Sequence, residues 1–157
     1  MEAVRLAVPE DGPRVGELVA ELVAAVSLQR GGSLLIDPEG EWSGPALAGA
    51  LTGLLEDHRH LVLVGTLDGV VTGVAVSHHD DRGGHGRLGT LDACYVEPGA
   101  RGQGLGRLLL DAALAWLTGQ GCHGVDGVAL PGDRAGKNFY EGAGFKARML
   151  TMHRPLG

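Results

Sequence analysis

The chain has 157 residues, of which 44% are hydrophobic and 20% are charged, and its formal net charge is −6. This length fits one domain of ordinary size, so we expect a single domain over residues 1–157. The acidic balance argues against a nucleic-acid-binding surface, because phosphate binding needs clustered lysine and arginine.

Targeting and metal signals are also lacking in the sequence. No apolar run approaches the length of a membrane span, and the first residues lack the apolar core of a signal peptide. The two cysteines, Cys94 and Cys122, have no metal-ligand spacing, which favours reduced thiols. We therefore expect a cytoplasmic protein that binds neither a membrane nor a metal ion.

Hydrophobic periodicity and turn residues predict the elements in chain order. The first half contains a strand at 4–8, an amphipathic helix at 13–28, a loop at 29–42, a helix at 43–57, and strands at 61–67 and 70–77 around an Asp68-Gly69 hairpin turn. The second half contains a polar turn at 79–86, a strand at 89–96, a helix at 107–117, a strand at 125–130, a helix at 133–141 and a final strand at 145–154. This order predicts an α+β fold in which helices flank a twisted mixed sheet.

The most informative segment is the glycine-rich stretch between the strand at 89–96 and the following helix. It reads Arg101-Gly102-Gln103-Gly104-Leu105-Gly106. Glycines let the backbone approach a ligand closely, and the free N–H groups and positive dipole end of the next helix attract an anion. A Walker loop is excluded, because Arg107 and Leu108 stand where that loop needs Lys and then Ser or Thr. The stretch predicts a phosphate or pyrophosphate site, with a simple tight turn as the alternative.

Two blocks in the second half carry a family resemblance. Residues 96–109, Val-Glu-Pro-Gly-Ala-Arg-Gly-Gln-Gly-Leu-Gly-Arg-Leu-Leu, resemble the acetyl-CoA-binding motif of the GNAT superfamily of N-acetyltransferases. Residues 138–145, Asn-Phe-Tyr-Glu-Gly-Ala-Gly-Phe, resemble a later motif of the same family. The resemblance implies the GNAT-type fold, a cofactor-binding core at about 87–154, and direct transfer of an acetyl group from acetyl-CoA to a primary amine in a ternary complex.

The same resemblance implies how acetyl-CoA is bound. Arg101 and the amides of residues 102–107 would anchor the pyrophosphate, while the backbone of Cys94 and Val96 would pair with the pantetheine arm like an added strand. The Val96 amide would then point at the thioester carbonyl. The cofactor-binding residues expected are Cys94, Tyr95, Val96, Arg101, Gly102, Gln103, Gly104, Leu105, Gly106, Arg107 and Asp133. Asp133 stands where the family has Asn, and capping of the next helix is its alternative role.

Two side chains are candidates for catalysis. Tyr140 is expected to be the acid that protonates the leaving thiolate, because a phenol is protonated at neutral pH. Its structural alternative is a ring packed beside Phe139 and Phe145. Asp92 is expected on the same strand face as Val96, where it would accept the proton of the amine directly or through a water. Its structural alternative is a carboxylate that holds a neighbouring arginine or caps a loop.

A cluster of histidines and aspartates also has residue types that bind metals. His78, His79, Asp80, Asp81 and His85 lie within eight residues, but they are predicted to form a solvated hairpin tip rather than a metal site. The thiol at position 94 is predicted to pack rather than to act as a nucleophile, because the family transfers the acetyl group directly.

The acceptor is the least determined part of the prediction. Trp42 and the acids Asp37, Glu39 and Glu41 are expected either to line the acceptor cleft or to lie in a solvated loop. A polyamine, an aminoglycoside-like amine, an amino acid and a protein N-terminus or lysine all stay open, and a homodimer is usual for the family. A catalytically silent acetyl-CoA sensor is the second functional class, although a sensor has no need of Tyr140.

Overall fold

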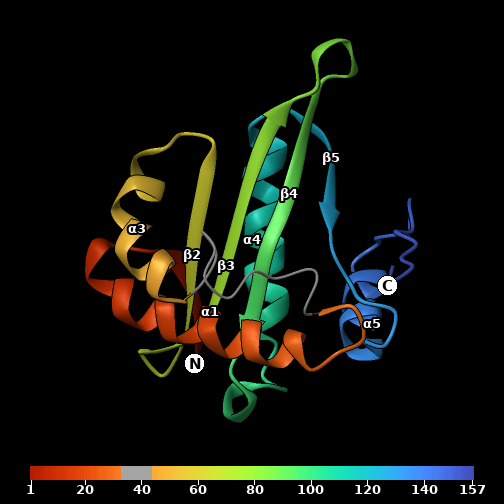
Figure 1. Cartoon of the computed structure of the whole chain (residues 1–157). Helices are drawn as coiled ribbons and strands as arrows, with labels where there is room; N and C mark the ends of the chain where they lie inside the picture. The colour runs from red at the N-terminus through yellow and green to blue at the C-terminus, as the bar shows by residue number, and fades with distance from the viewer. Residues whose placement is uncertain (33–43) are drawn as a thin grey trace.

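The structure is a computed structural model that describes residues 1–32 and 44–157. Five strands form one mixed sheet in the order β1-β2-β3-β4-β5 (Figure 1). They are β1 Glu2–Leu6, β2 His60–Leu67, β3 Val70–Asp81, β4 Arg87–Val96 and β5 Cys122–Gly127. The helices of the described part are α1 Gly12–Ser27, α3 Gly44–Glu56, α4 Leu105–Gly119 and α5 Arg134–Gly142, with 3-10 turns at Pro9–Asp11, Gly83–His85 and Pro98–Ala100. The predicted α+β fold around a mixed sheet is confirmed.

The helices form a layer on each face of the sheet. Helices α1 and α3 cover one face and α4 covers the other (Figure 1). Strands β1 to β4 run antiparallel to their neighbours, whereas β5 runs parallel to β4. Because β2 is buried on both faces, it forms a nearly continuous apolar run, and this is why its predicted bounds of 61–67 agree with the structure.

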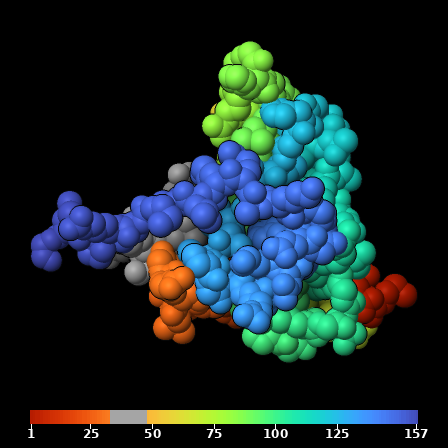
Figure 2. All heavy atoms as spheres, turned by 90° about the vertical axis from the view of Figure 1, so that its right-hand side faces the viewer, coloured from red at the N-terminus to blue at the C-terminus, as the bar shows by residue number. Residues whose placement is uncertain are grey.

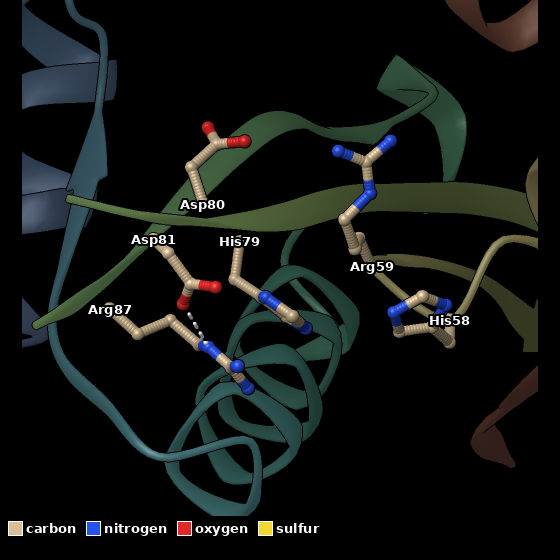
Figure 3. Close-up of a pocket in the computed structure, with 6 residues that line it drawn as sticks. All are labelled: His58, Arg59, His79, Asp80, Asp81 and Arg87. Atoms are coloured by element: carbon tan, nitrogen blue, oxygen red, sulfur yellow. Dashed lines mark hydrogen bonds and ion pairs between the residues drawn. The ribbon is translucent and has the colours of Figure 1, made fainter. Parts of the chain in front are cut away.

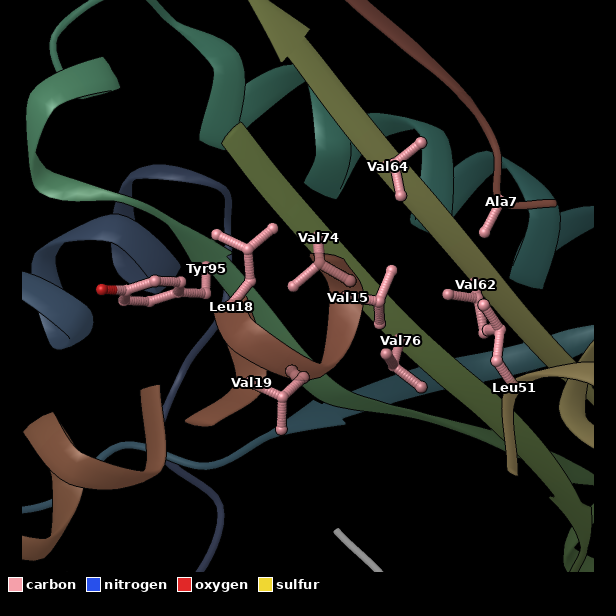
Figure 4. Packing of buried hydrophobic residues seen from close by; sticks show 11 residues of the cluster. Ala7, Val15, Leu18, Val19, Leu51, Val62, Val64, Val74, Val76 and Tyr95 are labelled. Carbon is pink, nitrogen blue, oxygen red and sulfur yellow. The ribbon is translucent and has the colours of Figure 1, made fainter. Parts of the chain in front are cut away.

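The core under α1 and α3 consists mainly of aliphatic side chains (Figure 4). Val15 and Leu18 of α1 and Leu51 of α3 are at most 1% exposed, and they pack on Val74 and Val76 of β3. Each such side chain contributes about 1.5–3 kcal/mol when fully buried. This packing fixes the central strands, and it thereby fixes β4, which forms one wall of the candidate site.

A β-bulge interrupts the pairing of β3 with β4 at Asp92. Ala93 pairs with Val76 and Leu91 pairs with Ser77, so Asp92 is the extra residue of β4. The bulge shifts the alternation of side chains along the strand. Asp92 consequently contacts His78 on the α1 side, whereas Cys94 and Val96 pack toward α4. The expectation that Asp92 shares a face with Val96 is therefore wrong.

Several predicted elements differ from the structure. The strands expected at 4–8 and 125–130 form two or three residues earlier, at Glu2–Leu6 and Cys122–Gly127. Strand β3 continues to Asp81, so the predicted polar turn at 79–86 is reduced to residues 82–86. The predicted strand at 145–154 does not form. The start of this tail is held by side chains instead, since Phe145 packs on Tyr140 and Arg148 pairs with Asp126 of β5. Figure 2 shows the last residues extending away from the body of the molecule, and Met149, Leu150 and Met152 are exposed.

An ion pair ties the end of β1 to the start of α1. Asp11 is 10% exposed and accepts hydrogen bonds from Arg5 at 2.7 and 3.0 Å and from the Val8 amide at 2.8 Å. These donors, chiefly the Arg5 guanidinium, hold the pKa of Asp11 below its ordinary value. A carboxyl with a lowered folded-state pKa stabilises the fold above its unfolded pKa, and this contribution disappears as the pH falls through the folded-state value.

We expect Asp11→Ala to lower the free energy of unfolding by about 2 kcal/mol at pH 7, the usual value for hydrogen bonds to a charged group. For a chain of this length the melting temperature falls by roughly 4–8 °C. The difference in the free energy of unfolding between the variant and the wild type should become smaller at acidic pH, because the wild-type carboxylate is protonated there and loses its ion pair. Glu17→Ala is the control, because Glu17 pairs with Arg14 at an exposed position and should change little. A pH-independent gap would contradict the assignment.

Candidate active site

The glycine-rich segment forms an anion cradle at the N-terminus of α4. Gly102 and Gly104 have φ angles of +83° and +82°, which glycine adopts readily and other residues rarely do. The first bond of the helix runs from the Leu108 amide to the Gly104 carbonyl, 3.1 Å. The amides of residues 105–107 precede that bond and have no earlier turn to donate to. With the helix dipole they provide the donors that a phosphate needs.

Two arginines stand at this cradle. The Arg101 Nε donates to the Val96 carbonyl oxygen at 2.8 Å, and its guanidinium lies 5.4 Å from the centre of the Tyr95 ring. Arg107 pairs with Asp111 one turn further along α4, 2.8 Å away. Arg101 is exposed, so its remaining N–H groups are free to face an anion. Its bond to Val96 joins the cradle directly to the end of β4.

The end of β4 has an open edge. Pairing with β5 stops at Leu91 with Gly127, so within residues 1–32 and 44–157 no strand pairs with residues 92–96 of β4 on that side. The Glu97 amide donates to the Thr72 carbonyl on β3, 2.9 Å. Successive amides of a strand point to opposite edges, so the amides of Cys94 and Val96 face the open edge. An extended chain can pair there as an added strand.

The side chains along this edge point to different layers. Tyr95 is buried toward α1, where its hydroxyl donates to Glu21 at 3.2 Å. Tyr95 can therefore reach a ligand at the open edge only through its backbone. The Cys94 thiol faces α4 and donates to the Gly106 carbonyl oxygen at 3.8 Å. Burial raises the pKa of Cys94 to about 12. The thiol is thus protonated at neutral pH, which agrees with packing and disfavours a nucleophile.

Tyr140 lies at the point where β5 ends. Its ring packs between Phe139 and Phe145, with centroid distances of 5.7 and 5.1 Å. On β5, Gly127 leaves room for it, because a Cβ at position 127 would lie 2.8 Å from the Tyr140 ring. Burial raises the pKa of Tyr140 to about 12, so the hydroxyl keeps its proton at neutral pH. The ring is both packed and chemically able to donate a proton.

We expect Gly127→Ala to displace the Tyr140 ring. The added methyl group overlaps the ring and should cost about 1–3 kcal/mol of stability by overpacking. If Tyr140 is the acid, kcat should fall together with this displacement. Gly124→Ala on the same strand is the matched control, since its Cβ would meet Leu88 at an ordinary 3.8 Å. Equal turnover by the two variants would count against a role for the ring position.

Asp133 caps α5. Its side chain accepts a hydrogen bond from the Gly136 amide at 2.9 Å, in the position of an N-cap. Helix α5, which carries most of the second motif, therefore begins after Asp133, and Tyr140 lies two turns later. Because the carboxylate is already used in capping, its expected contact with acetyl-CoA stays a prediction.

Asp92 is paired with a histidine rather than with an arginine. Its Oδ2 lies 2.6 Å from Nδ1 of His78, and its side chain is only 13% exposed. Burial raises the pKa of Asp92 above its ordinary value, and the contact with His78 offsets this only in part. The prediction that His78 belongs to a solvated hairpin tip is wrong. The alternation of side chains along β3 could have located His78, because residues 74, 76 and 78 share one face of a strand and Val74 and Val76 are buried there.

His79 is also part of the strand rather than of a loop. It is 4% exposed, and its ring lies 5.5 Å from that of Trp116 on α4. Burial lowers the pKa of His79. It lines a pocket of about 300 Å³ (Figure 3), in which Arg87 pairs with Asp81 at 2.8 Å. The pocket is lined by His58, Arg59, His79, Asp80, Asp81 and Arg87, and it is separate from the cradle.

A larger hollow of about 750 Å³ lies beyond the β3–β4 hairpin, along β5. It is lined by residues of β5, the hairpin tip, α4 and the start of the C-terminal tail. Within residues 1–32 and 44–157, His, Cys, Asp and Glu side chains do not gather in groups of three that could hold a metal ion. No helix in the described part of the chain is long and apolar enough to cross a membrane. Asp37, Glu39, Glu41 and Trp42 lie outside the described residues.

The sequence profile of the Acetyltransferase (GNAT) family matches residues 31–145. The chain therefore belongs to the GNAT acetyltransferase family, and its mixed sheet with flanking helices is the fold of that family. No curated protein matches the sequence.

Solved structures of acetyltransferases share this fold. A predicted acetyltransferase of Clostridium acetobutylicum, solved with acetyl-CoA, has a TM-score of 0.75 at 18% identity, covering 99% of this chain and 96% of that chain. A ribosomal-protein-alanine N-acetyltransferase of Brucella melitensis has a TM-score of 0.71 at 18% identity, with full coverage of both chains (100% each). An aminoglycoside N-acetyltransferase in complex with CoA has a TM-score of 0.76 at 16% identity, covering 99% of this chain and 95% of that chain. At such identities the likeness shows the fold and leaves the acceptor open.

Proposed function

We propose that this protein transfers the acetyl group of acetyl-CoA to a primary amine by direct attack in a ternary complex. The observation that carries the proposal is the open edge of β4. It begins beside Asp92, passes the outward-facing amides of Cys94 and Val96, and ends at the anion cradle of α4. A phosphate group at one end and an extended arm along the edge fit this arrangement.

The residues of the chain have separate tasks in this proposal. The amides of residues 102–107, with Arg101, bind the pyrophosphate, and the β4 edge orients the pantetheine arm. When bound, acetyl-CoA supplies the thioester from which the acetyl group leaves. The Val96 amide donates toward the thioester carbonyl. Tyr140 gives its hydroxyl proton to the departing sulfur, and the proton of the amine is taken up at Asp92, either directly, through a water or through the histidine that Asp92 holds.

The two catalytic candidates lie on different sides of the open edge. Tyr140 packs with the α4 layer, whereas Asp92 and His78 face the α1 layer. This separation suits a reaction in which the amine approaches from one side and the sulfur leaves toward the other. It also favours an enzyme over the sensor, because a sensor needs only the cradle and the edge.

Thermal unfolding with and without acetyl-CoA, CoA and ATP tests the proposal. A ligand at about 100 times its Kd stabilises the folded state by roughly 2.7 kcal/mol, which is a shift of several degrees at this size. We expect shifts with acetyl-CoA and CoA and none with ATP. The absence of any shift would refute the cradle assignment.

The acceptor and the assembly need their own measurements. Two of the structural neighbours act on amines of different kinds, a ribosomal-protein alanine and an aminoglycoside. We therefore propose an amine panel of spermidine, kanamycin, free lysine and an alanine-initiated peptide, read by release of the CoA thiol. Thiol release with no member of the panel, despite binding of acetyl-CoA, would favour the sensor. A cytoplasmic location and a homodimer belong to the same proposal, and light scattering measures the mass in solution.

A further inference from the structure

The bulge of β4 brings together three polar side chains that the sequence motifs do not connect. Nδ1 of His78 lies 2.6 Å from Oδ2 of Asp92, and Nε2 of the same ring lies 3.2 Å from Oδ2 of Asp80. The exposed fraction of the side chains rises along this row, from 13% for Asp92 to 23% for His78 and 44% for Asp80. The row thus runs from a buried carboxylate to the solvent.

The buried end of the row fixes the state of the imidazole. An ionised carboxylate only accepts hydrogen bonds, so the contact with Asp92 requires a proton at Nδ1 of His78. The contact of Nε2 with Asp80 requires a second proton and so belongs to the imidazolium, whereas the neutral ring presents the lone pair of Nε2. A buried aspartate that holds a histidine in this way sets its tautomer and stabilises the imidazolium that forms later. Histidine is also the side chain that takes up and releases protons most readily near neutral pH.

The position of the row suits the reaction. Asp92 directly follows Leu91, the last residue of β4 that pairs with β5, and the partner of Leu91 is Gly127, which contacts Tyr140. The row therefore begins where the open edge begins, on the side of the sheet away from Tyr140. Beyond the ring, Nε2 and the Asp80 carboxylate converge as two acceptors, and a primary ammonium group has donors for both.

We propose that His78 is the general base of the acetyl transfer and that Asp92 is its positioning residue. The inference rests on the proposed function. One N–H bond of the acceptor ammonium breaks, the proton forms an N–H bond at Nε2 of His78, and the electron pair stays on the amine nitrogen as its nucleophilic lone pair. The proton then leaves the ring past Asp80 into solvent.

Several charged groups surround the ring. His60 of β2 stacks on His78 with a centroid distance of 5.4 Å. Asp57 lies 3.1 Å from Nδ1 of His60. The titratable and charged groups near His78 in the described part of the chain are Asp92, Asp80, His60, Asp57 and Arg59. Of these, only Asp92 and Asp80 are hydrogen-bonded to the ring.

The first arm of the test needs neither acceptor nor acetyl-CoA. Long-range proton–nitrogen NMR of the imidazoles should show the neutral His78 ring protonated at Nδ1, and Asp92→Ala should abolish that preference. A ring protonated at Nε2 in the wild type, or one unchanged by Asp92→Ala, overturns the proposal even if the protein acetylates amines. This arm therefore separates failure of the inference from failure of the proposed function.

The second arm is kinetic and uses the panel amine with the highest turnover. His78→Asn keeps an N–H for Asp92 but cannot take up a proton, so we expect kcat to fall about 100-fold with an unchanged KM for acetyl-CoA. The variant should also lose the limb of the pH–rate profile that reports the base. His60→Asn is the matched control, because it removes the stacked ring and leaves the bond to Asp92. His78→Gln replaces His78→Asn if the latter does not fold.

Two further readouts exclude a merely structural role. Adding free imidazole to His78→Ala should restore part of the activity. The double variant His78→Asn with Asp92→Ala should be no slower than the slower single variant, because residues that act as one unit are not additive. An unchanged pH profile, no rescue and additive losses would show that His78 only supports the fold.

Discussion

Tyr140→Phe is expected to lower kcat by about 100-fold or more while the Kd of acetyl-CoA stays near the wild-type value. The substitution removes only the hydroxyl and keeps the ring between Phe139, Phe145 and Gly127. Because burial raises the pKa of Tyr140 to about 12, the wild-type hydroxyl is protonated throughout the neutral range and is able to donate. Steady-state kinetics with acetyl-CoA and a panel amine, beside calorimetric binding of acetyl-CoA, measure the two quantities.

Phe145→Leu distinguishes the role of the Tyr140 hydroxyl from the role of the packing around its ring. It disturbs the same aromatic group from the tail side and leaves the Tyr140 hydroxyl in place. We expect it to cost stability, in the range of about 1–3 kcal/mol typical of a core shape change, and to retain most of the turnover. If Phe145→Leu lost as much turnover as Tyr140→Phe, or if Tyr140→Phe weakened binding as much as catalysis, the acid role would have to be abandoned.

The second large effect is expected at the cradle, where Gly104→Leu should abolish binding of acetyl-CoA. Gly104 has a φ of +82° and directly precedes α4, with open space around the position of a Cβ. A side chain there occupies the place where a phosphate would reach the free amides of the helix. The roughly 2.7 kcal/mol of stabilisation expected from acetyl-CoA at 100 times its Kd should disappear from the thermal unfolding curve.

Gly121→Leu is a closely matched control. Gly121 has the same φ of +82° and equally open surroundings, but it follows the other end of α4. The free energy of unfolding should fall by about 1–2 kcal/mol in both variants, because leucine is less stable than glycine in a left-handed backbone conformation. Only Gly104→Leu should lose the response to acetyl-CoA. A loss of the response in both variants would mean that stability, rather than the cradle, governs the measurement.

Local chemistry made the backbone shape of the glycine-rich segment before α4 predictable. The glycines at 102 and 104 indicate a backbone conformation that other residues rarely adopt. The first turn of the helix that follows has free amides whatever its tertiary surroundings. Strand β2 was located well for a similar reason, since a continuous apolar run leaves few alternatives. Asp133 as a helix cap follows from the same kind of short-range rule.

Long-range pairing made the surroundings of Asp92 unpredictable. The bulge at Asp92 adds one unpaired residue to β4, and nothing in the apolar pattern of the strand marks it. Once the alternation shifts, Asp92 and Val96 no longer share a face, and the partner of Asp92 becomes a histidine on β3. The prediction of a strand at 145–154 was wrong because strand pairing is also long-range. The composition of this segment suits a strand, but a strand forms only where an edge pairs with it.

The contact between Gly127 and Tyr140 has a consequence for sequence variation among relatives. The phenol ring fits against β5 only because position 127 carries no side chain. A relative that keeps tyrosine at the position of Tyr140 should therefore keep glycine at the position of Gly127. A relative with a larger residue there should have lost the aromatic ring or moved its end of β5 outward. The two positions should thus co-vary, although they belong to different elements and lie outside the glycine-rich motif.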